Sequence, residues 1–145
     1  MNNMFENDEA FLAQARAYFD GDTFVFRTIG MEVIAAAPGH ALVSMEAEPH
    51  IGNAKAGVHG GALFTLADIA VAVADFNPDE INMTVDASIQ YLAPSKGSVL
   101  YAHAYAKKRG GTMGFYRVDI ADDLDATVAV ASFTYLHRPF RTAEG

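Results

Sequence analysis

The stretch GVHGGALFTLADIAVAVADF, residues 57–76, sets the interpretation of the whole chain. Between residues 62 and 76, twelve of fifteen side chains are apolar, and neither glycine nor proline interrupts them. A run of this length predicts a helix, and a helix that is apolar on nearly every side must be buried on nearly every side. Its polar residues, Thr65, Asp68 and Asp75, share one narrow face. We therefore predict a buried central helix whose polar face contacts something other than hydrocarbon.

Segments with clear periodicity surround this helix. Residues 8–20 carry apolar side chains at helical spacing and predict an amphipathic helix. The segment INMTVDASIQY, residues 81–91, alternates apolar and polar side chains, which predicts a long, half-buried strand with its polar residues on the other face. Further strands are predicted where strand-forming residues run between turn residues. These segments are residues 31–37, 41–47, 98–107, 113–121 and 126–137.

The order of these elements predicts an α+β fold in a single domain over residues 1–145. Four consecutive strands without intervening helices pair antiparallel, and their sheet must cover the apolar helix. The simplest such architecture is the hotdog fold, a curved antiparallel sheet wrapped around one long helix. We place its core at residues 30–138, after a helix and lead-in at 1–29 and before a tail at 139–145.

Composition and charge argue against several classes of function. The chain has no cysteine, so it has neither a thiolate nucleophile nor cysteine-ligated zinc. A net charge of −8 disfavours nucleic acid as a partner, because phosphate binding needs a basic face. No apolar run approaches membrane-spanning length, and the N-terminus does not resemble a signal peptide. We therefore expect a cytoplasmic protein that binds neither membrane nor nucleic acid.

A set of glycine and polar residues at fixed spacing indicates the chemistry. Asn53 lies six residues before the triplet HGG at 59–61, LAD follows at 66–68, and TVDASIQYLAP, from residue 84, covers most of the next predicted strand. With these motifs the chain resembles the hotdog-fold acyl-CoA thioesterases of the PaaI-like group, which includes the phenylacetate-degradation and hydroxybenzoyl-CoA enzymes. The resemblance covers about residues 30–138.

The resemblance implies a role for each of these residues. The Gly60 backbone N–H would polarise the thioester carbonyl, and Asp68 would be the catalytic carboxylate, acting as nucleophile or as general base. Asn53 would help to place the water or the carbonyl, and Thr84 lies near where some members keep a hydroxyl that assists the water. For His59, a structural role at the turn that presents Gly60 is favoured over that of a general base. The family acts on acyl-CoA without metal or redox cofactor, as a homodimer and often as a homotetramer.

The physical properties of these positions agree with the implied roles. Gly60 and Gly61 begin the predicted helix, where unpaired N–H groups and the helix dipole favour an oxyanion. Glycine at both positions lets a ligand approach the backbone, so Gly61 is a candidate substrate contact. Asp68 lies eight residues after Gly60, about 12 Å along the helix axis, too far to act with it on one carbonyl. If both act on one thioester, Asp68 must come from an antiparallel helix of a second chain, so catalysis predicts a dimer.

Basic residues are candidates for binding the phosphates of coenzyme A. Lys107, Lys108 and Arg109 precede Gly110 at a predicted hairpin, where they would donate charge-assisted hydrogen bonds to phosphate. The alternative is a solvated hairpin end whose charges discourage pairing with another strand. Lys96, in another predicted turn, has the same two interpretations.

The remaining titratable residues receive no functional role. Asp75 lies on the same helix face as Asp68, where we expect it only to mark the point at which the helix reaches solvent. The other histidines show no spacing typical of metal ligands, and we expect surface or half-buried positions for them. They are His40, His50, His103 and His137.

The favoured function is hydrolysis of an aryl- or medium-chain acyl-CoA to a carboxylic acid and free coenzyme A. One alternative is a non-catalytic acyl-CoA-binding module for sensing, which would not need Asp68. Another is a hotdog hydratase or dehydratase, which would need a histidine paired with a carboxylate. The acyl group, the choice between dimer and tetramer, and the role of Asp68 as nucleophile or base stay open.

Overall fold

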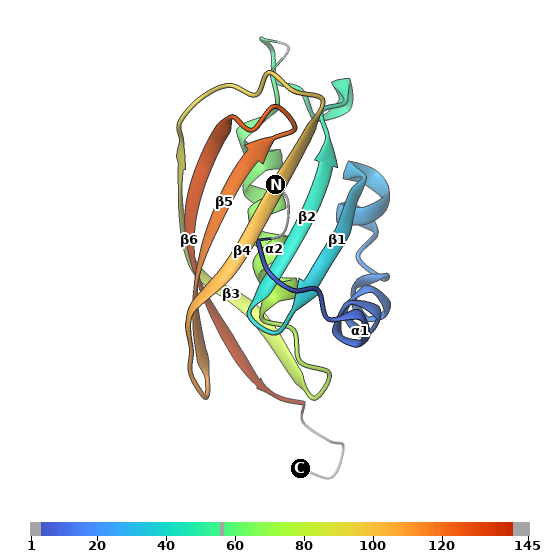
Figure 1. The fold of residues 1–145 in the computed structure, drawn as a ribbon, viewed down its shortest axis with the longest axis vertical. Helices are drawn as coiled ribbons and strands as arrows, with labels where there is room; N and C mark the ends of the chain where they lie inside the picture. Colours follow the sequence, from blue (N-terminus) through green and yellow to red (C-terminus); the bar gives the residue numbers. More distant parts are fainter. Residues whose placement is uncertain (1–3, 56, 141–145) are drawn as a thin grey trace.

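Six strands form one continuous antiparallel sheet that curves around the helix α2 (Gly60–Ala74), as Figure 1 shows. The computed structural model describes residues 4–55 and 57–140. The strands are β1 (Met31–Ala37), β2 (His40–Glu46), β3 (Glu80–Tyr91), β4 (Val99–Arg109), β5 (Met113–Asp122) and β6 (Thr127–Pro139). Their order across the sheet is β1-β2-β4-β5-β6-β3, so β1 and β3 form the two edges.

The predicted architecture is confirmed. Both long predicted helices and all six predicted strands are present, with ends that differ by a few residues. The sequence analysis did not predict a π-helix at Phe24–Ile29 or a single 3-10 turn at Pro49–Ile51. Of the predicted tail, Pro139 belongs to β6, and residues 141–145 lie outside the described residues.

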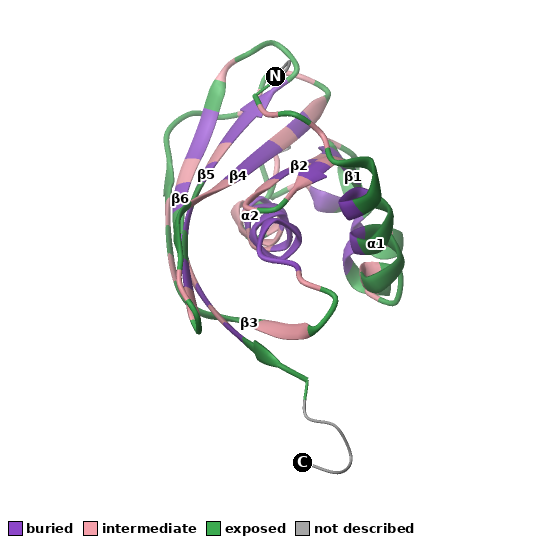
Figure 2. Ribbon diagram, turned by 60° about the horizontal axis from the view of Figure 1, so that its bottom comes forward, coloured by how far each residue is buried: buried purple, intermediate pink, exposed green. Residues whose placement is uncertain are grey.

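The helix α2 fills the concave side of the sheet, and its apolar sequence explains this position. Figure 2 shows the helix inside the curve of the sheet, with buried residues dominating it. Contacts with β2 and β4 cover one side of the helix. The side chains of α2 that are fully buried are Leu66, Ala67, Ala70, Val71 and Val73.

The N-terminal helix α1 (Glu9–Phe19) packs beside β1 at the opposite edge of the sheet from β3 (Figure 1). Asp8 caps the helix, because its side chain accepts a hydrogen bond from the Phe11 N–H at 3.0 Å. Phe11, Leu12 and Ala15 are the buried residues on its apolar face. This helix therefore extends the core past the sheet edge that β1 would otherwise expose.

The edge strand β3 contains a bulge at Val85 that the sequence pattern did not predict. The register with β6 shifts between Thr84 and Asp86, so one residue of β3 has no partner in the ladder. An extra residue in a strand reverses the side-chain alternation beyond it. The prediction that residues 81–91 keep two constant faces is therefore wrong.

The bulge decides which residues of β3 face the central helix. Before it, Asn82 donates to a backbone carbonyl of α2 at 3.1 Å, and Thr84 donates to a carboxylate of α2. After it, the apolar residues Ala87 and Ile89 pack against the core. Thr84 thus faces inward, and the prediction that it lies on an outward polar face is corrected.

A buried cluster of charged groups closes the C-terminal end of α2. Asp75, which we expected at the solvent boundary, is 1% exposed. Its Oδ1 accepts from the Tyr116 hydroxyl at 2.5 Å and lies 3.1 Å from His137 Nδ1 and 3.2 Å from Arg109 Nε. His137 is also fully buried, with Nε2 2.7 Å from Gly110 O. The expectation of a solvent boundary at Asp75 and that of a surface or half-buried position for His137 were both wrong, because β4, β5 and β6 cover this end of the helix.

Candidate active site

The N-terminus of α2 presents one available backbone donor. His59 is the N-cap, and its Nδ1 accepts the Gly61 N–H at 3.0 Å. The structure therefore engages Gly61 within the chain, although the sequence analysis considered it as a substrate contact. Across the part of the chain that the structure describes, the Gly60 N–H has no acceptor. With the positive end of the helix dipole behind it, this N–H is suited to an oxyanion.

Tyr91, at the end of β3, holds Gly60 from one side. Its hydroxyl donates to the Gly60 carbonyl at 2.7 Å. A Cβ atom added at Gly60 would lie 3.2 Å from the Tyr91 ring, which is tighter than an ordinary contact. A side chain at this position would therefore have to push the Tyr91 ring away by a few tenths of an ångström.

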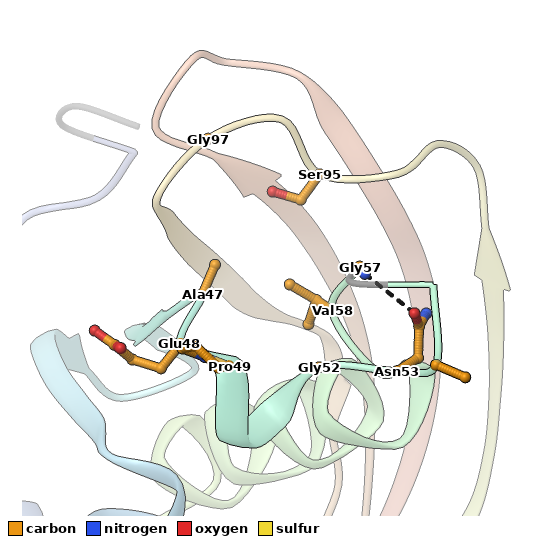
Figure 3. Close-up of a pocket in the computed structure, with 10 residues that line it drawn as sticks. Ala47, Glu48, Pro49, Gly52, Asn53, Gly57, Val58, Ser95 and Gly97 are labelled. Atoms are coloured by element: carbon orange, nitrogen blue, oxygen red, sulfur yellow. Dashed lines mark hydrogen bonds between the residues drawn. The ribbon is translucent and has the colours of Figure 1, made fainter.

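Asn53 belongs to the loop that precedes α2, and its side chain folds back onto that loop. Its Oδ1 accepts hydrogen bonds from the N–H groups of Lys55 at 2.9 Å and Gly57 at 3.1 Å, the second of which Figure 3 shows. The side-chain oxygen thus shapes the loop, while the amide NH2 group remains the part of Asn53 that can face a ligand.

Two adjoining cavities open beside this helix end. The first, of about 490 Å³, is lined by loop residues that include Glu48, Asn53, Val58 and Ser95, as Figure 3 shows. The second, of about 410 Å³, includes Gly60 in its lining and is otherwise largely apolar. Its larger apolar side chains are Val58, Leu63, Tyr91, Leu92, Pro94 and Val128. A cavity of this kind beside a backbone donor can hold an apolar group while the donor contacts a carbonyl.

Asp68 lies half-buried on the middle of α2, where two hydroxyl groups converge on it. Thr84 Oγ1 donates to Asp68 Oδ1 at 2.6 Å, and the Tyr135 hydroxyl lies 2.6 Å from the same oxygen. Burial and the nearby charge of Asp68 raise the pKa of Tyr135, so its hydroxyl stays protonated and donates. Asp68 is thus held by side chains of β3 and β6.

Within one chain, Gly60 and Asp68 do not form a single site. Eight residues of the same helix separate them, which corresponds to about 12 Å of axial rise. The structure therefore places the predicted carbonyl donor and the predicted carboxylate at two separate positions on α2.

The predicted phosphate-binding residues divide between the two ends of α2. Lys96 is exposed in the loop whose neighbours Ser95 and Gly97 line the first cavity. Lys107 and Lys108 are exposed near the β4–β5 hairpin, at the far end of the helix.

Arg109 and Gly110 are engaged within that far end. The Arg109 guanidinium donates to Glu80 at 2.7 Å and pairs with Asp75. The Gly110 carbonyl faces His137 at 2.7 Å.

Sequence reasoning missed both tyrosines that contact the site. Tyr91 appeared only as an apolar residue of an alternating strand, and Tyr135 lay in a strand that received no functional role. The hydroxyl of Tyr135 contacts a residue 67 positions earlier in the chain, and that of Tyr91 one 31 positions earlier. The only sequence signal for these two contacts is that each tyrosine lies in a strand predicted to cover the central helix.

The remaining expectations concern metals, histidines and membranes. In residues 4–55 and 57–140, no cluster of three or more acidic or histidine side chains is placed to hold a metal ion. His103 is 6% exposed, which corrects the expectation of a surface or half-buried position.

No helix among the described residues has both the length and the hydrophobicity needed to cross a membrane.

Comparison with known proteins identifies relatives over most of the chain. The acyl-coenzyme A thioesterase PaaI of Escherichia coli K12 is 30% identical over 117 residues, which cover 80% of this chain and 83% of that protein. The 1,4-dihydroxy-2-naphthoyl-CoA hydrolase of Listeria monocytogenes is 24% identical over 110 residues, covering 74% and 89% of the two chains.

Solved structures agree with these relatives. The structure of the E. coli PaaI protein aligns with a TM-score of 0.84 at 25% identity and covers 92% of this chain and 96% of that one. A Streptococcus mutans protein bound to acetyl CoA aligns with a TM-score of 0.71 at 26% identity, covering 77% and 91%.

A family model described as the thioesterase superfamily matches residues 57–129. The matched region begins just before Gly60 and includes Asp68 and Thr84, whereas Asn53 and Tyr135 lie outside it. The chain therefore belongs to the thioesterase superfamily.

Proposed function

We propose that this protein is an acyl-CoA thioesterase that hydrolyses an aryl- or medium-chain acyl-CoA. The observation that carries the proposal is the available N–H of Gly60, at the start of a buried helix and in the lining of an apolar cavity. Such a donor, fixed before the reaction, stabilises the negative charge that develops on a thioester carbonyl oxygen. Membership of the thioesterase superfamily and the acyl-CoA relatives support the same activity.

The carboxylate of the site is Asp68 of the partner subunit in this proposal. The strand β3 lies at an edge of the sheet and exposes the apolar side chains Met83 and Val85. A free edge with apolar side chains is suited to pairing with a second copy of the chain. A two-fold axis that places two α2 helices antiparallel brings each Gly60 toward the other chain's carboxylate and creates two equal sites.

The reaction adds water across the thioester bond. The carbon–sulfur bond breaks, water supplies the hydroxyl of the carboxylic acid, and the thiolate of coenzyme A takes up a proton. Asp68 either attacks the carbonyl carbon, forming a mixed anhydride that water then opens, or removes a proton from the attacking water. Both routes use protein groups alone, so the proposal includes no metal or redox cofactor. It also includes a cytoplasmic location, which a cysteine-free chain suits.

The coenzyme A phosphates require cationic partners in this proposal. Lys96 lies beside the cavities, and an antiparallel dimer would bring Lys107 and Lys108 of the partner subunit toward the same end of α2. Arg109 is left out of this set, because Glu80 and Asp75 already occupy its guanidinium. Asn53 contributes its amide group to placing water or the carbonyl.

The first test is release of free thiol, measured with a thiol-reactive dye over a panel of aryl- and alkyl-acyl-CoA substrates. We expect turnover by the wild type, and a loss of roughly a hundredfold to ten-thousandfold in Asp68→Asn, because the amide can neither attack nor accept a proton. The matched control is Asp20→Asn, which changes an exposed aspartate on the N-terminal side of the molecule.

Each outcome of this test has one meaning. Turnover that survives in Asp20→Asn and is lost in Asp68→Asn supports the proposal. A near-native rate in Asp68→Asn would remove Asp68 from the mechanism. Binding of acyl-CoA without thiol release from any substrate would show that the protein is a sensing module and not an enzyme.

A further inference from the structure

Two hydroxyl groups from neighbouring strands bind the same oxygen of Asp68. Thr84 of β3 and Tyr135 of β6 face each other in register, and each lies 2.6 Å from Asp68 Oδ1. Among the residues that the structure describes, Asp68 Oδ2 accepts no hydrogen bond. The carboxylate is therefore asymmetric, with one oxygen held and the other available.

The Tyr135 hydroxyl has one proton and two acceptors within reach. Its oxygen lies 2.6 Å from Asp68 Oδ1 and 2.8 Å from the Asp68 backbone carbonyl. That carbonyl lies inside α2, where the helix supplies its own donor. Hydrogen bonds to a charged acceptor are the stronger ones, so the proton of Tyr135 is directed to the carboxylate.

The two hydroxyls differ in how firmly they are held. Tyr135 is 2% exposed, and its ring packs against those of Phe133 and Tyr116, so the core determines the position of its hydroxyl. Thr84 lies exposed on the edge strand, next to the bulge at Val85. Tyr135 therefore provides the rigid part of the contact, and Thr84 completes it.

We infer that Tyr135 is a positioning residue for the reaction, which together with Thr84 holds Asp68 Oδ1 so that Oδ2 is the oxygen that attacks the thioester or activates water. This inference rests on the proposed thioesterase function. Tyr135 itself touches no substrate atom and acts only through Asp68. A carboxylate fixed before substrate arrives reacts faster than one that must be oriented in the transition state.

The test compares Tyr135→Phe with a matched control, Tyr116→Phe. Both tyrosines lie on the inner face of the sheet, and each donates to an aspartate of α2 or its cap, but Tyr116 donates to Asp75, away from the site. We expect Tyr135→Phe to lower kcat about tenfold to a hundredfold with KM unchanged, because one hydrogen bond to a charged group is lost. Tyr116→Phe should keep kcat within about twofold, although both lose thermal stability.

The split between kcat and KM separates positioning from a merely structural role. A positioning residue that does not touch the substrate affects the rate of the reaction and not substrate binding, so Tyr135→Phe should lower kcat at unchanged KM. A residue that only stabilises the fold lowers the melting temperature and leaves the kcat of the folded protein unchanged, which is the result expected for Tyr116→Phe.

Wild type and Asp68→Asn are run in parallel, so that the two proposals fail in different ways. Absence of thiol release by the wild type would overturn the proposed function, and this inference with it. An active wild type and an inactive Asp68→Asn, combined with wild-type kcat in Tyr135→Phe, would overturn the inference alone. Equal losses of kcat in the two tyrosine variants would also overturn it, since they would reflect stability.

A second pair of variants decides the case if Tyr135→Phe does not fold. Thr84→Ser keeps the hydroxyl that binds Oδ1, and Thr84→Val removes it at nearly the same volume. We expect Thr84→Ser to keep kcat within about twofold of the wild type and Thr84→Val to lower it about tenfold at unchanged KM. Equal kcat in these two variants would show that the Thr84 hydroxyl does not hold Oδ1 for the reaction, and would overturn the inference, which assigns this oxygen to Thr84 and Tyr135 together.

Discussion

The N–H of Gly60 is available because its neighbours occupy the other groups at this helix end. His59 accepts the next N–H of the helix, and Tyr91 donates to the Gly60 carbonyl. These contacts fix the peptide before any ligand arrives, which is the condition under which a backbone donor stabilises a developing charge most. The donor is thus a property of three residues and not of glycine alone.

Replacing Gly60 by proline removes this N–H with little change to the helix. Proline is tolerated at the first helical position, and the extended conformation of His59 suits the residue before proline. We expect kcat to fall about a hundredfold to a thousandfold, measured by thiol release, with native circular dichroism.

The control for this variant is Gly60→Ala. It adds the same Cβ atom near the Tyr91 ring but keeps the N–H. We expect it to lose less than about tenfold, because the ring can move by a few tenths of an ångström. Equal activity in the proline and alanine variants would mean that the Gly60 N–H does not contact the reacting carbonyl.

At the scale of elements, the sequence predicted which segments form strands and helices more reliably than which faces they present. The alternation in β3 was clear, but the bulge at Val85 reverses it, so Thr84 faces α2 contrary to expectation. A bulge depends on pairing with β6, which local periodicity does not contain. The motif containing Gly60 and Asp68 was visible because its residues lie within one helix, whereas Tyr135 reaches Asp68 only through the folded sheet.

The outer face of β4 carries a buried histidine that makes stability depend on pH. His103 stacks against Phe5 and His40 and lies near Tyr105 and Asp119. Burial lowers the pKa of His103 below 6.5, the charge of His40 lowers it further, and Asp119 partly opposes this. At a pH between the His103 pKa of the folded protein and that of the unfolded chain, the unfolded chain binds more protons. The free energy of unfolding is therefore highest above pH 6.5 and decreases as the pH falls toward the His103 pKa of the folded protein.

Replacing His103 by phenylalanine should remove this part of the pH dependence. Both ring nitrogens of His103 are buried without a partner among the described residues, so an apolar ring costs no hydrogen bond there. We expect melting temperatures measured from about pH 7.5 to about pH 5.5 to fall less in His103→Phe than in the wild type. His50→Gln, which changes an exposed histidine, should follow the wild type, and a parallel decline in all three proteins would contradict the assignment.

At the scale of the whole molecule, one chain keeps the two main groups of the proposed site apart. The Gly60 donor and the Asp68 carboxylate lie about 12 Å apart on one helix, and the exposed edge strand β3 carries apolar side chains next to Asp68. The length of the helix between the two groups can be counted in the sequence, which is why the sequence analysis predicts a dimer, and the dimer stays a prediction. The surface of β3 that the proposed dimer would use could not be predicted, because the bulge determines which side chains of β3 are exposed.

Mixing two inactive variants tests this division directly. In a dimer of one Asp68→Asn chain and one Gly60→Pro chain, the intact Gly60 of the first lies opposite the intact Asp68 of the second, so one of two sites is complete. After random exchange of subunits, half of the dimers are mixed, and thiol release should recover to about a quarter of the wild-type rate. If Asp68 instead serves Gly60 of its own chain, every site in the mixture lacks one group and no activity returns. Native mass spectrometry measures the fraction of mixed dimers. A rate of thiol release that rises in proportion to this fraction would assign the carboxylate to the partner subunit.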